Sequence, residues 1–190
     1  MNTEKNKPYH HGNLRQELIE KGLEYINRCG VENLSMRKLA EEIGVSPAAP
    51  YAHFKNKEAF LESTREYITD SLTDALQETL EKCTHQERIL VELGKRYVFF
   101  FHENPFYFHF LFTTVNNDLS TNKAFGLFES VSSQILSEKD AGYSGKEIRN
   151  KTIAMWALVQ GIVQISLVDG VFNKKRMDKE IEEIICSLEV

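Results

Sequence analysis

The chain has 190 residues, of which 42% are hydrophobic and 27% charged, and 23 Lys and Arg against 28 Asp and Glu give a net charge of −5. This length and apolar content predict one or two folded domains and exclude a chain that is disordered throughout. No apolar run approaches the roughly 18 residues of a membrane span, and the polar N-terminus lacks the apolar core of a signal peptide. Three separated cysteines without a C-x-x-C pair indicate reduced thiols, so we expect a cytoplasmic protein without membrane contact.

The charge is unevenly distributed along the chain. Residues 1–60 carry 9 Lys and Arg against 8 Asp and Glu, whereas residues 61–190 carry 14 against 20. An acidic protein can still bind an anionic partner when its cations are gathered at one end. The numbers alone favour ordinary scatter, so they do not establish such a partner.

Glycines and capping residues divide the first part of the chain into short helices. Apolar residues at helical spacing predict a first helix that ends at Gly30. Ser35 is expected to cap a second, short helix that closes at Gly44. Ser46 is expected to cap a third helix, with Pro47 at its first position, where the missing N–H is not needed.

Longer helices follow in the second part of the chain. Asn56 is expected to cap a helix that runs without Gly or Pro to about residue 83. Ser144 and Glu147 have the spacing of a capping box, in which each side chain satisfies a backbone N–H of the other residue. The remaining expected helices are 86–103, one that ends near residue 137, 147–168, which is apolar on nearly every side, and 178–188. Together these patterns predict an all-α protein.

The segment between Ser35 and Lys57 has the proportions of a helix-turn-helix. Two short helices are joined by a tight turn at Gly44, and the second helix is too short to be stable without packing. Phe54 is the expected anchor of this second helix. Its other face offers small or neutral groups that can approach a polyanion: Ala48, Ala49, Tyr51, Ala52 and His53.

The sequence GVSPAAPYAHFKNK from Gly44 to Lys57 closely resembles the DNA-binding signature of the TetR/AcrR family of bacterial transcriptional regulators. The resemblance is specific over about residues 9–61. It implies a three-helix helix-turn-helix DNA-binding domain at 9–57 and a helical effector-binding and dimerisation domain at 58–190. The sequence WALVQG at 156–161 also resembles a W-x-x-x-H-G element of one group in the family, with Gln160 in place of the histidine.

The resemblance implies a set of DNA contacts. Tyr51 and His53 correspond to a pair that binds phosphate, and Lys57 places a cation in the first turn of the next helix. The other expected contacts are Ser35, Arg37, Ser46, Ala48 and Ala49. Alternatives remain for several of these residues, since Tyr51 can be a half-buried core aromatic, His53 a structural histidine, and the two serines simple caps.

Base recognition is the least defined part of this prediction. Alanines can touch a thymine methyl group but cannot form a bidentate hydrogen bond with a base. Pro50 removes a further donor from the recognition helix. Specificity can then depend on DNA shape, on Tyr51, or on the arm formed by residues 5–11 in a minor groove. That arm can equally be a solvated tail.

The resemblance further implies a homodimer formed through helices 147–168 and 178–188, and a ligand cavity beside them. The candidates for lining that cavity are Phe99, Phe106, Tyr107, Phe110, Trp156, Gln160 and Gln164. An aromatic stripe at helical spacing is also typical of plain core, and the two glutamines can instead form hydrogen bonds across a dimer interface.

No pattern in the chain predicts catalysis, a metal site or a cofactor. H-E-x-x-H, paired cysteines, a Gly-rich phosphate loop and G-x-S-x-G are all missing from the sequence. We therefore expect a ligand-responsive repressor, released from a palindromic double-stranded DNA operator by a small hydrophobic or aromatic effector. One alternative is a helical small-molecule-binding protein that no longer recognises an operator. The other is a small helical enzyme that uses His102 or His109.

Overall fold

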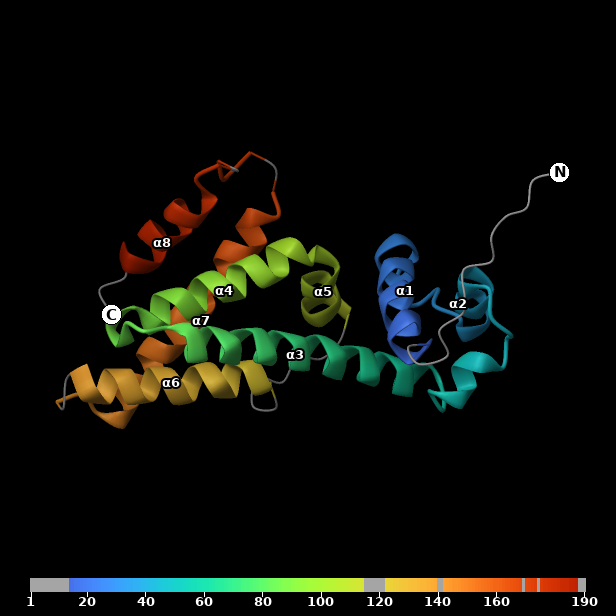
Figure 1. Ribbon diagram of the computed structural model, residues 1–190, viewed down its shortest axis with the longest axis horizontal. Helices are drawn as coiled ribbons and strands as arrows, with labels where there is room; N and C mark the ends of the chain where they lie inside the picture. The colour runs from blue at the N-terminus through green and yellow to red at the C-terminus, as the bar shows by residue number, and fades with distance from the viewer. Residues whose placement is uncertain (1–13, 115–121, 140–141, 169, 174, 188–190) are drawn as a thin grey trace. The chain divides into compact units, whose positions relative to one another are not determined.

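The computed structural model describes residues 14–114, 122–139, 142–168, 170–173 and 175–187, and every regular element within them is a helix (Figure 1). The predicted all-α class is confirmed. The chain divides into two compact units, residues 1–65 and 66–190, with the boundary inside the long helix α3 (Lys57–Lys82). This boundary lies further along the chain than the predicted one at residue 57. The arm at residues 5–11 lies outside the described residues.

The first unit contains α1 (Leu14–Cys29), α2 (Met36–Ile43), the 3₁₀ helix η1 (Ala49–Ala52) and the beginning of α3. The apolar positions of α1 repeat every three to four residues, so that one side of the helix faces the core. The core of the first unit is formed by side chains that are at most 3% exposed: Leu18, Ile19, Leu23, Ile26, Leu39, Phe54 and Phe60. α1 and α3 approach each other at Gly22, where an added Cβ would overlap the ring of Phe60.

Helix α2 ends at Gly44, as the sequence predicts. Gly44 has a φ of 80°, a left-handed conformation that glycine adopts without steric cost, and its N–H donates to the carbonyls of Ala40 and Glu41. The next N–H, that of Val45, donates to the carbonyl of Ala40 at 2.9 Å. The turn therefore supplies hydrogen-bond donors to the carbonyl groups at the end of α2 within a few residues.

The predicted third helix differs from the observed one. Ser46 does not cap an α-helix with Pro47 at its first position; the regular element is instead the 3₁₀ helix η1, which follows Ala48. Pro50 has no N–H to donate to the carbonyl of Ser46, which accepts at 2.9 Å from the N–H of Ala49 instead. A hydrogen bond from a backbone N–H to the carbonyl three residues earlier, in place of four, is characteristic of the tighter 3₁₀ turn.

The second unit contains the rest of α3 and the helices that follow it. Their bounds are η2 (Gln86–Arg88), α4 (Ile89–Glu103), α5 (Pro105–His109), the π-helical turn η3 (Phe110–Thr114), α6 (Lys123–Lys139), α7 (Gly145–Ser166) and α8 (Met177–Ser187). α7 packs against α4 and α6, and α8 packs mainly against α4 (Figure 1). α6 also meets α3, where the ammonium of Lys123 lies 2.6 Å from the carboxylate of Asp70.

Two predicted helix starts are confirmed in detail. The side chain of Asn56 accepts a hydrogen bond from the N–H of Ala59 at 2.8 Å and so caps α3. Ser144 and Glu147 form the complete capping box at the start of α7. α7 ends at Ser166 rather than at residue 168, and it is buried on one side only.

Candidate functional site

Residues 46–55, here called the recognition segment, present an exposed surface immediately after the turn at Gly44. Tyr51 is 55% exposed, and Ser46, Ala48 and His53 are exposed as well, while Ala49 is half-buried. The N–H groups of Tyr51 and His53 donate to carbonyls three residues back, at 3.1 and 3.0 Å. The side chains of Tyr51 and His53 are therefore exposed to solvent on a turn that backbone hydrogen bonds stabilise.

The opposite side of the recognition segment is anchored in the core of the first unit. Pro50 is buried, and the ring of Phe54 is 2% exposed. Phe54 packs edge-on against Phe60, with ring centroids 5.1 Å apart, and the guanidinium of Arg15 lies over the same ring at 5.5 Å. The Phe54 prediction thus agrees with the structure, and Tyr51 is an exposed side chain rather than a core aromatic.

The three predicted contacts outside this segment lie at helix starts. Ser35 precedes α2 in an extended conformation, and its hydroxyl makes no capping hydrogen bond, so the capping interpretation of this side chain is wrong. Arg37 is exposed and lies 3.4 Å from the carboxylate of Glu41. Lys57 begins α3, and its ammonium donates to the carbonyl of Glu32 at 3.3 Å.

The charge of this region differs in sign from that of the whole chain. Between Ser35 and Lys57 there are four Lys and Arg residues and two Glu, against a net charge of −5 overall. Hydroxyl, imidazole and cationic donors on an exposed turn match the hydrogen-bond acceptors of a phosphodiester backbone. The alanines between them allow close approach but supply only apolar contact to bases.

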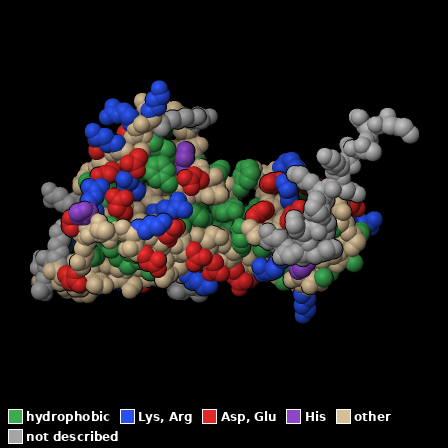
Figure 2. All heavy atoms as spheres, viewed as in Figure 1, with side chains coloured by type: hydrophobic (Ala, Val, Ile, Leu, Met, Phe, Trp, Pro, Cys, Tyr) green, Lys and Arg blue, Asp and Glu red, His purple; other side chains and the backbone are tan. Residues whose placement is uncertain are grey.

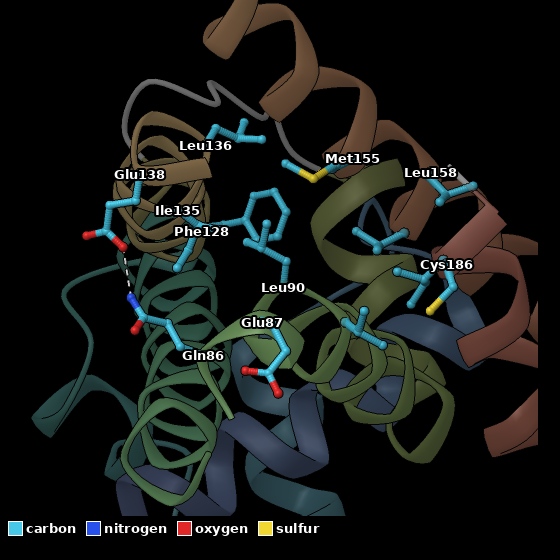
Figure 3. Close-up of a pocket in the computed structure, with 13 residues that line it drawn as sticks. Gln86, Glu87, Leu90, Phe128, Ile135, Leu136, Glu138, Met155, Leu158 and Cys186 are labelled. Carbon is cyan, nitrogen blue, oxygen red and sulfur yellow. Dashed lines mark hydrogen bonds between the residues drawn. The ribbon is translucent and has the colours of Figure 1, made fainter. Parts of the chain in front are cut away.

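The second unit contains an apolar cavity of about 630 Å³ (Figure 3). This volume is in the range of sites for drug-sized ligands, roughly 300–1,000 Å³. Helices α4, α6, α7 and α8 each contribute apolar side chains, and the lining consists chiefly of Leu90, Val91, Phe128, Ile135, Leu136, Met155, Leu158, Val159, Ile185 and Cys186. The polar lining residues are Gln86, Glu87 and Glu138.

None of the seven residues predicted to line an effector pocket lines this cavity. Phe110 is 1% exposed and Trp156 is 5% exposed, so both belong to the core, whereas Phe106 is 40% exposed. Phe99 and Tyr107 are half-buried. The aromatic cluster, defined as the rings between Tyr97 and Phe112, packs largely on itself, because rings of α4 meet rings of α5 and η3. Phe101 is central, with ring centroids 5.4 Å from Phe108 and 6.2 Å from Phe112.

The two predicted glutamines have different surroundings. Gln164 is exposed, and Gln160 is half-buried beside the hydroxyl of Tyr97. Burial raises the pKa of the Tyr97 hydroxyl well above its usual value, and Gln160 opposes that shift. The Tyr97 hydroxyl has no hydrogen bond of normal geometry to the described residues.

The residues that line the cavity were not identified from the sequence. Their apolar spacing on α6 and α7 indicates sides that face inward, but it does not distinguish the wall of a cavity from filled core. In the described part of the chain, no group of three or more His, Cys, Asp or Glu is placed to hold a metal ion. No helix of that part is both long and apolar enough to cross a membrane.

Comparison with known proteins identifies the first unit. Residues 18–64 match the sequence profile described as bacterial regulatory proteins, tetR family. Over 52 residues the chain is 46% identical to the class C tetracycline repressor protein of Escherichia coli, a match that covers 27% of this chain and 24% of the repressor. The chain spans about a quarter of the length of the curated relatives it matches first.

Over most of its length the chain also resembles solved structures, whose sequence identity to it is lower than that of the repressors. The TetR-family transcriptional regulator PfmR from Thermus thermophilus has a TM-score of 0.70 and 20% identity, covering 91% of this chain and 99% of that one. The transcriptional regulator FadR from Bacillus subtilis, solved in complex with stearoyl-CoA, has a TM-score of 0.71 and 15% identity over 90% and 97% of the two chains. At these identities the likeness establishes the fold.

Proposed function

Because this chain belongs to the TetR family of transcriptional regulators, we propose that it binds operator DNA through its first unit and responds to a small molecule bound in its second. The observation that carries the proposal is the exposed recognition segment, with Tyr51 and His53 on a turn whose other side is buried. The proposed DNA contacts are Ser35, Arg37, Ser46, Ala48, Ala49, Tyr51, His53 and Lys57. Its relatives are regulatory proteins rather than enzymes.

The proposed active form is a homodimer that binds a palindromic operator in the cytoplasm. The predicted interface helices, 147–168 and 178–188, correspond closely to α7 and α8. The side of α7 that the second unit leaves exposed carries Ile153 and Ile165, 42% and 48% exposed, and Val168, just beyond the end of the helix, is 58% exposed. Apolar side chains gathered on an exposed helix face support burial against a second copy.

The proposed response is repression that ends when an effector binds. A two-fold dimer places its recognition segments about one DNA turn or more apart, so a change in their separation reduces binding to both half-sites. An effector that prefers the non-binding form by a few kcal/mol is sufficient for this switch. The apolar cavity supports an effector site in the second unit, at a position different from the aromatic cluster.

The proposal is tested by fluorescence anisotropy of the protein with DNA that flanks its own gene and with a scrambled duplex. We expect selective binding whose log–log salt dependence has a slope near −0.9 for each phosphate contact. Tyr51→Ala should weaken binding by about tenfold or more, since a hydrogen bond to a charged group contributes about 1.5–3 kcal/mol. Because Tyr51 is exposed, this variant should unfold at the temperature of the unchanged protein.

Tyr51→Phe and Lys21→Ala serve as controls. The first retains the ring and removes only the hydroxyl, so it should lose most of the same affinity. Lys21 lies on α1 and pairs with Glu24 at 2.8 Å, and its replacement should leave DNA binding unchanged. Equal and weak binding of both duplexes, unaffected by Tyr51→Ala, would contradict operator recognition and support a helical ligand-binding protein. That alternative is favoured only by the alanines and Pro50 in the recognition segment.

A further inference from the structure

The walls of the apolar cavity are apolar, whereas one edge of it is polar and acidic. Its walls come from aliphatic side chains, Phe128 and the thioether of Met155, while Gln86, Glu87 and Glu138 gather at one edge (Figure 3). Two of the 13 lining residues are acidic, and the other 11 include neither Lys nor Arg. The cavity is therefore apolar in its interior and negatively charged at its edge.

The hydrogen bonds of the edge carboxylates do not neutralise their charge. The carboxylate of Glu138 accepts from the amides of Gln86 and Gln134, at 2.8 and 3.0 Å, and both donors are neutral. The carboxylate of Glu87 lies 3.3 Å from Nδ1 of His85, which carries a charge only when it is protonated.

The cation that follows Glu87 in the sequence, Arg88, is bound elsewhere. Its guanidinium lies 3.0 Å from the carboxylate of Glu92 and 2.7 Å from that of Glu182. An anionic ligand would thus meet two carboxylates without a compensating lysine or arginine in the described lining. A cationic ligand would supply the missing partner, and its apolar body would displace water from the walls.

From this arrangement we propose that the cavity binds a lipophilic organic cation, with its apolar body among α4, α6, α7 and α8 and its positive charge beside Glu87 and Glu138. The regulatory meaning of this site rests on the proposed function, whereas the binding itself does not. The charge of the site distinguishes it from one for an acyl-CoA, whose phosphate groups require cations.

The chain contains a single tryptophan that can report occupancy. Trp156 packs against Phe128, with ring centroids 5.6 Å apart, and Phe128 lines the cavity. The probes are tetraphenylphosphonium and tetraphenylborate, which have nearly the same size and shape but opposite charge. Titration of the full-length protein at 0.15 M salt, about the physiological ionic strength, should change Trp156 emission saturably with tetraphenylphosphonium. Tetraphenylborate should bind about tenfold or more weakly.

The edge carboxylates are tested by the double variant Glu87→Gln with Glu138→Gln. Both residues are exposed, so the fold should persist, as checked by far-ultraviolet circular dichroism. Neutralising one exposed carboxylate should reduce affinity for the cation by about two- to fivefold. The double variant should therefore bind the cation about 4- to 25-fold more weakly, and it should bind the anion more tightly. The matched control is Glu129→Gln, an exposed residue of α6 that does not line the cavity, and it should change neither affinity.

A third variant tests the position of the site. Leu158→Phe fills part of the cavity and should weaken tetraphenylphosphonium binding at least fivefold without changing the charge of the edge. Equal affinity for the two probes, or a double variant that binds the cation as well as the unchanged protein, would overturn the proposal. Full binding by Leu158→Phe would overturn it too, because the cation would then lie elsewhere.

Anisotropy with operator DNA separates this inference from the proposed function. Release of DNA by tetraphenylphosphonium, lost in the double variant, would support both. Charge-selective binding of the cation with no effect on DNA affinity would support the cavity assignment and contradict the proposed ligand response. Selective DNA binding together with equal affinity for the two probes would support DNA recognition and overturn the cavity assignment.

Discussion

Gly22 shows how one missing side chain allows two helices to pack closely. An alanine here would place its Cβ against the ring of Phe60, which is fully buried. We expect Gly22→Ala to destabilise the protein by about 1–3 kcal/mol, the usual cost of overpacking a core. Urea unfolding followed by circular dichroism measures this change.

The matched control for Gly22 is Gly126, in α6. An added Cβ at Gly126 meets no atom within 4 Å, so Gly126→Ala should be neutral or should stabilise by about 0.5–1 kcal/mol through reduced backbone freedom in the unfolded chain. Similar midpoints for the two variants would show that the close approach at Gly22 is unimportant.

At the scale of an element, α8 is held on α4 and η2 by ion pairs that link two of its carboxylates to two cations. Lys95, 13% exposed, lies 2.9 Å from Asp178 and 3.0 Å from Glu182, and Arg88 lies 2.7 Å from Glu182. The hydrogen bond from Arg88, followed by that from Lys95, lowers the pKa of Glu182 below its ordinary value of 4.5. The contribution to stability is therefore present above pH 4.5 and is lost as the pH falls through the lower pKa of the folded state.

This linkage predicts a difference in acid sensitivity. Glu182→Gln should lower the free energy of unfolding at pH 7 by on the order of 1 kcal/mol, and its stability should fall less steeply than that of the unchanged protein below about pH 5. Thermal unfolding across about pH 3–7 checks the difference. Glu183→Gln, at an exposed position one residue further along α8, should follow the unchanged protein. Parallel pH profiles for Glu182→Gln and the unchanged protein would contradict the linkage.

At the scale of the whole molecule, the charges on the visible face of the second unit are mixed in sign (Figure 2). The exposed apolar residues of α7 are therefore a better candidate for self-association than a surface of one charge. Ile165→Lys should convert a dimer of twice 21.9 kDa into a monomer, because a cation would be buried in the proposed interface. Light scattering after size exclusion measures the mass.

The dimer prediction has a functional readout as well. Ile165→Lys should also weaken operator binding by about a hundredfold or more, since each half-site would bind separately. Ser130→Lys adds the same charge at an exposed position of α6 and should leave mass and affinity unchanged. A monomeric unchanged protein, or a variant that remains dimeric, would contradict the proposed interface.

The sequence alone determined those features whose causes lie within a few residues. A left-handed glycine at Gly44, a cap at Asn56 and the capping box of Ser144 and Glu147 depend on hydrogen bonds between near neighbours, so spacing was sufficient to predict them. The resemblance of residues 44–57 likewise placed the helix-turn-helix. The third helix departs from its prediction for an equally local reason, because Pro50 cannot donate to the carbonyl of Ser46.

Only the tertiary structure decided where the second unit is filled and where it is hollow. Phe110 and Trp156 were predicted to line a cavity, with plain core as the alternative, and both are buried in the core. Whether the inward side of a helix meets a neighbouring helix or an empty volume depends on residues far away in the chain. Gln86 and Glu138 are 52 positions apart and become neighbours only when α4 and α6 pack on α7. The apolar cavity and its acidic edge arise from this packing, because helix periodicity specifies a direction but not the partner that lies there.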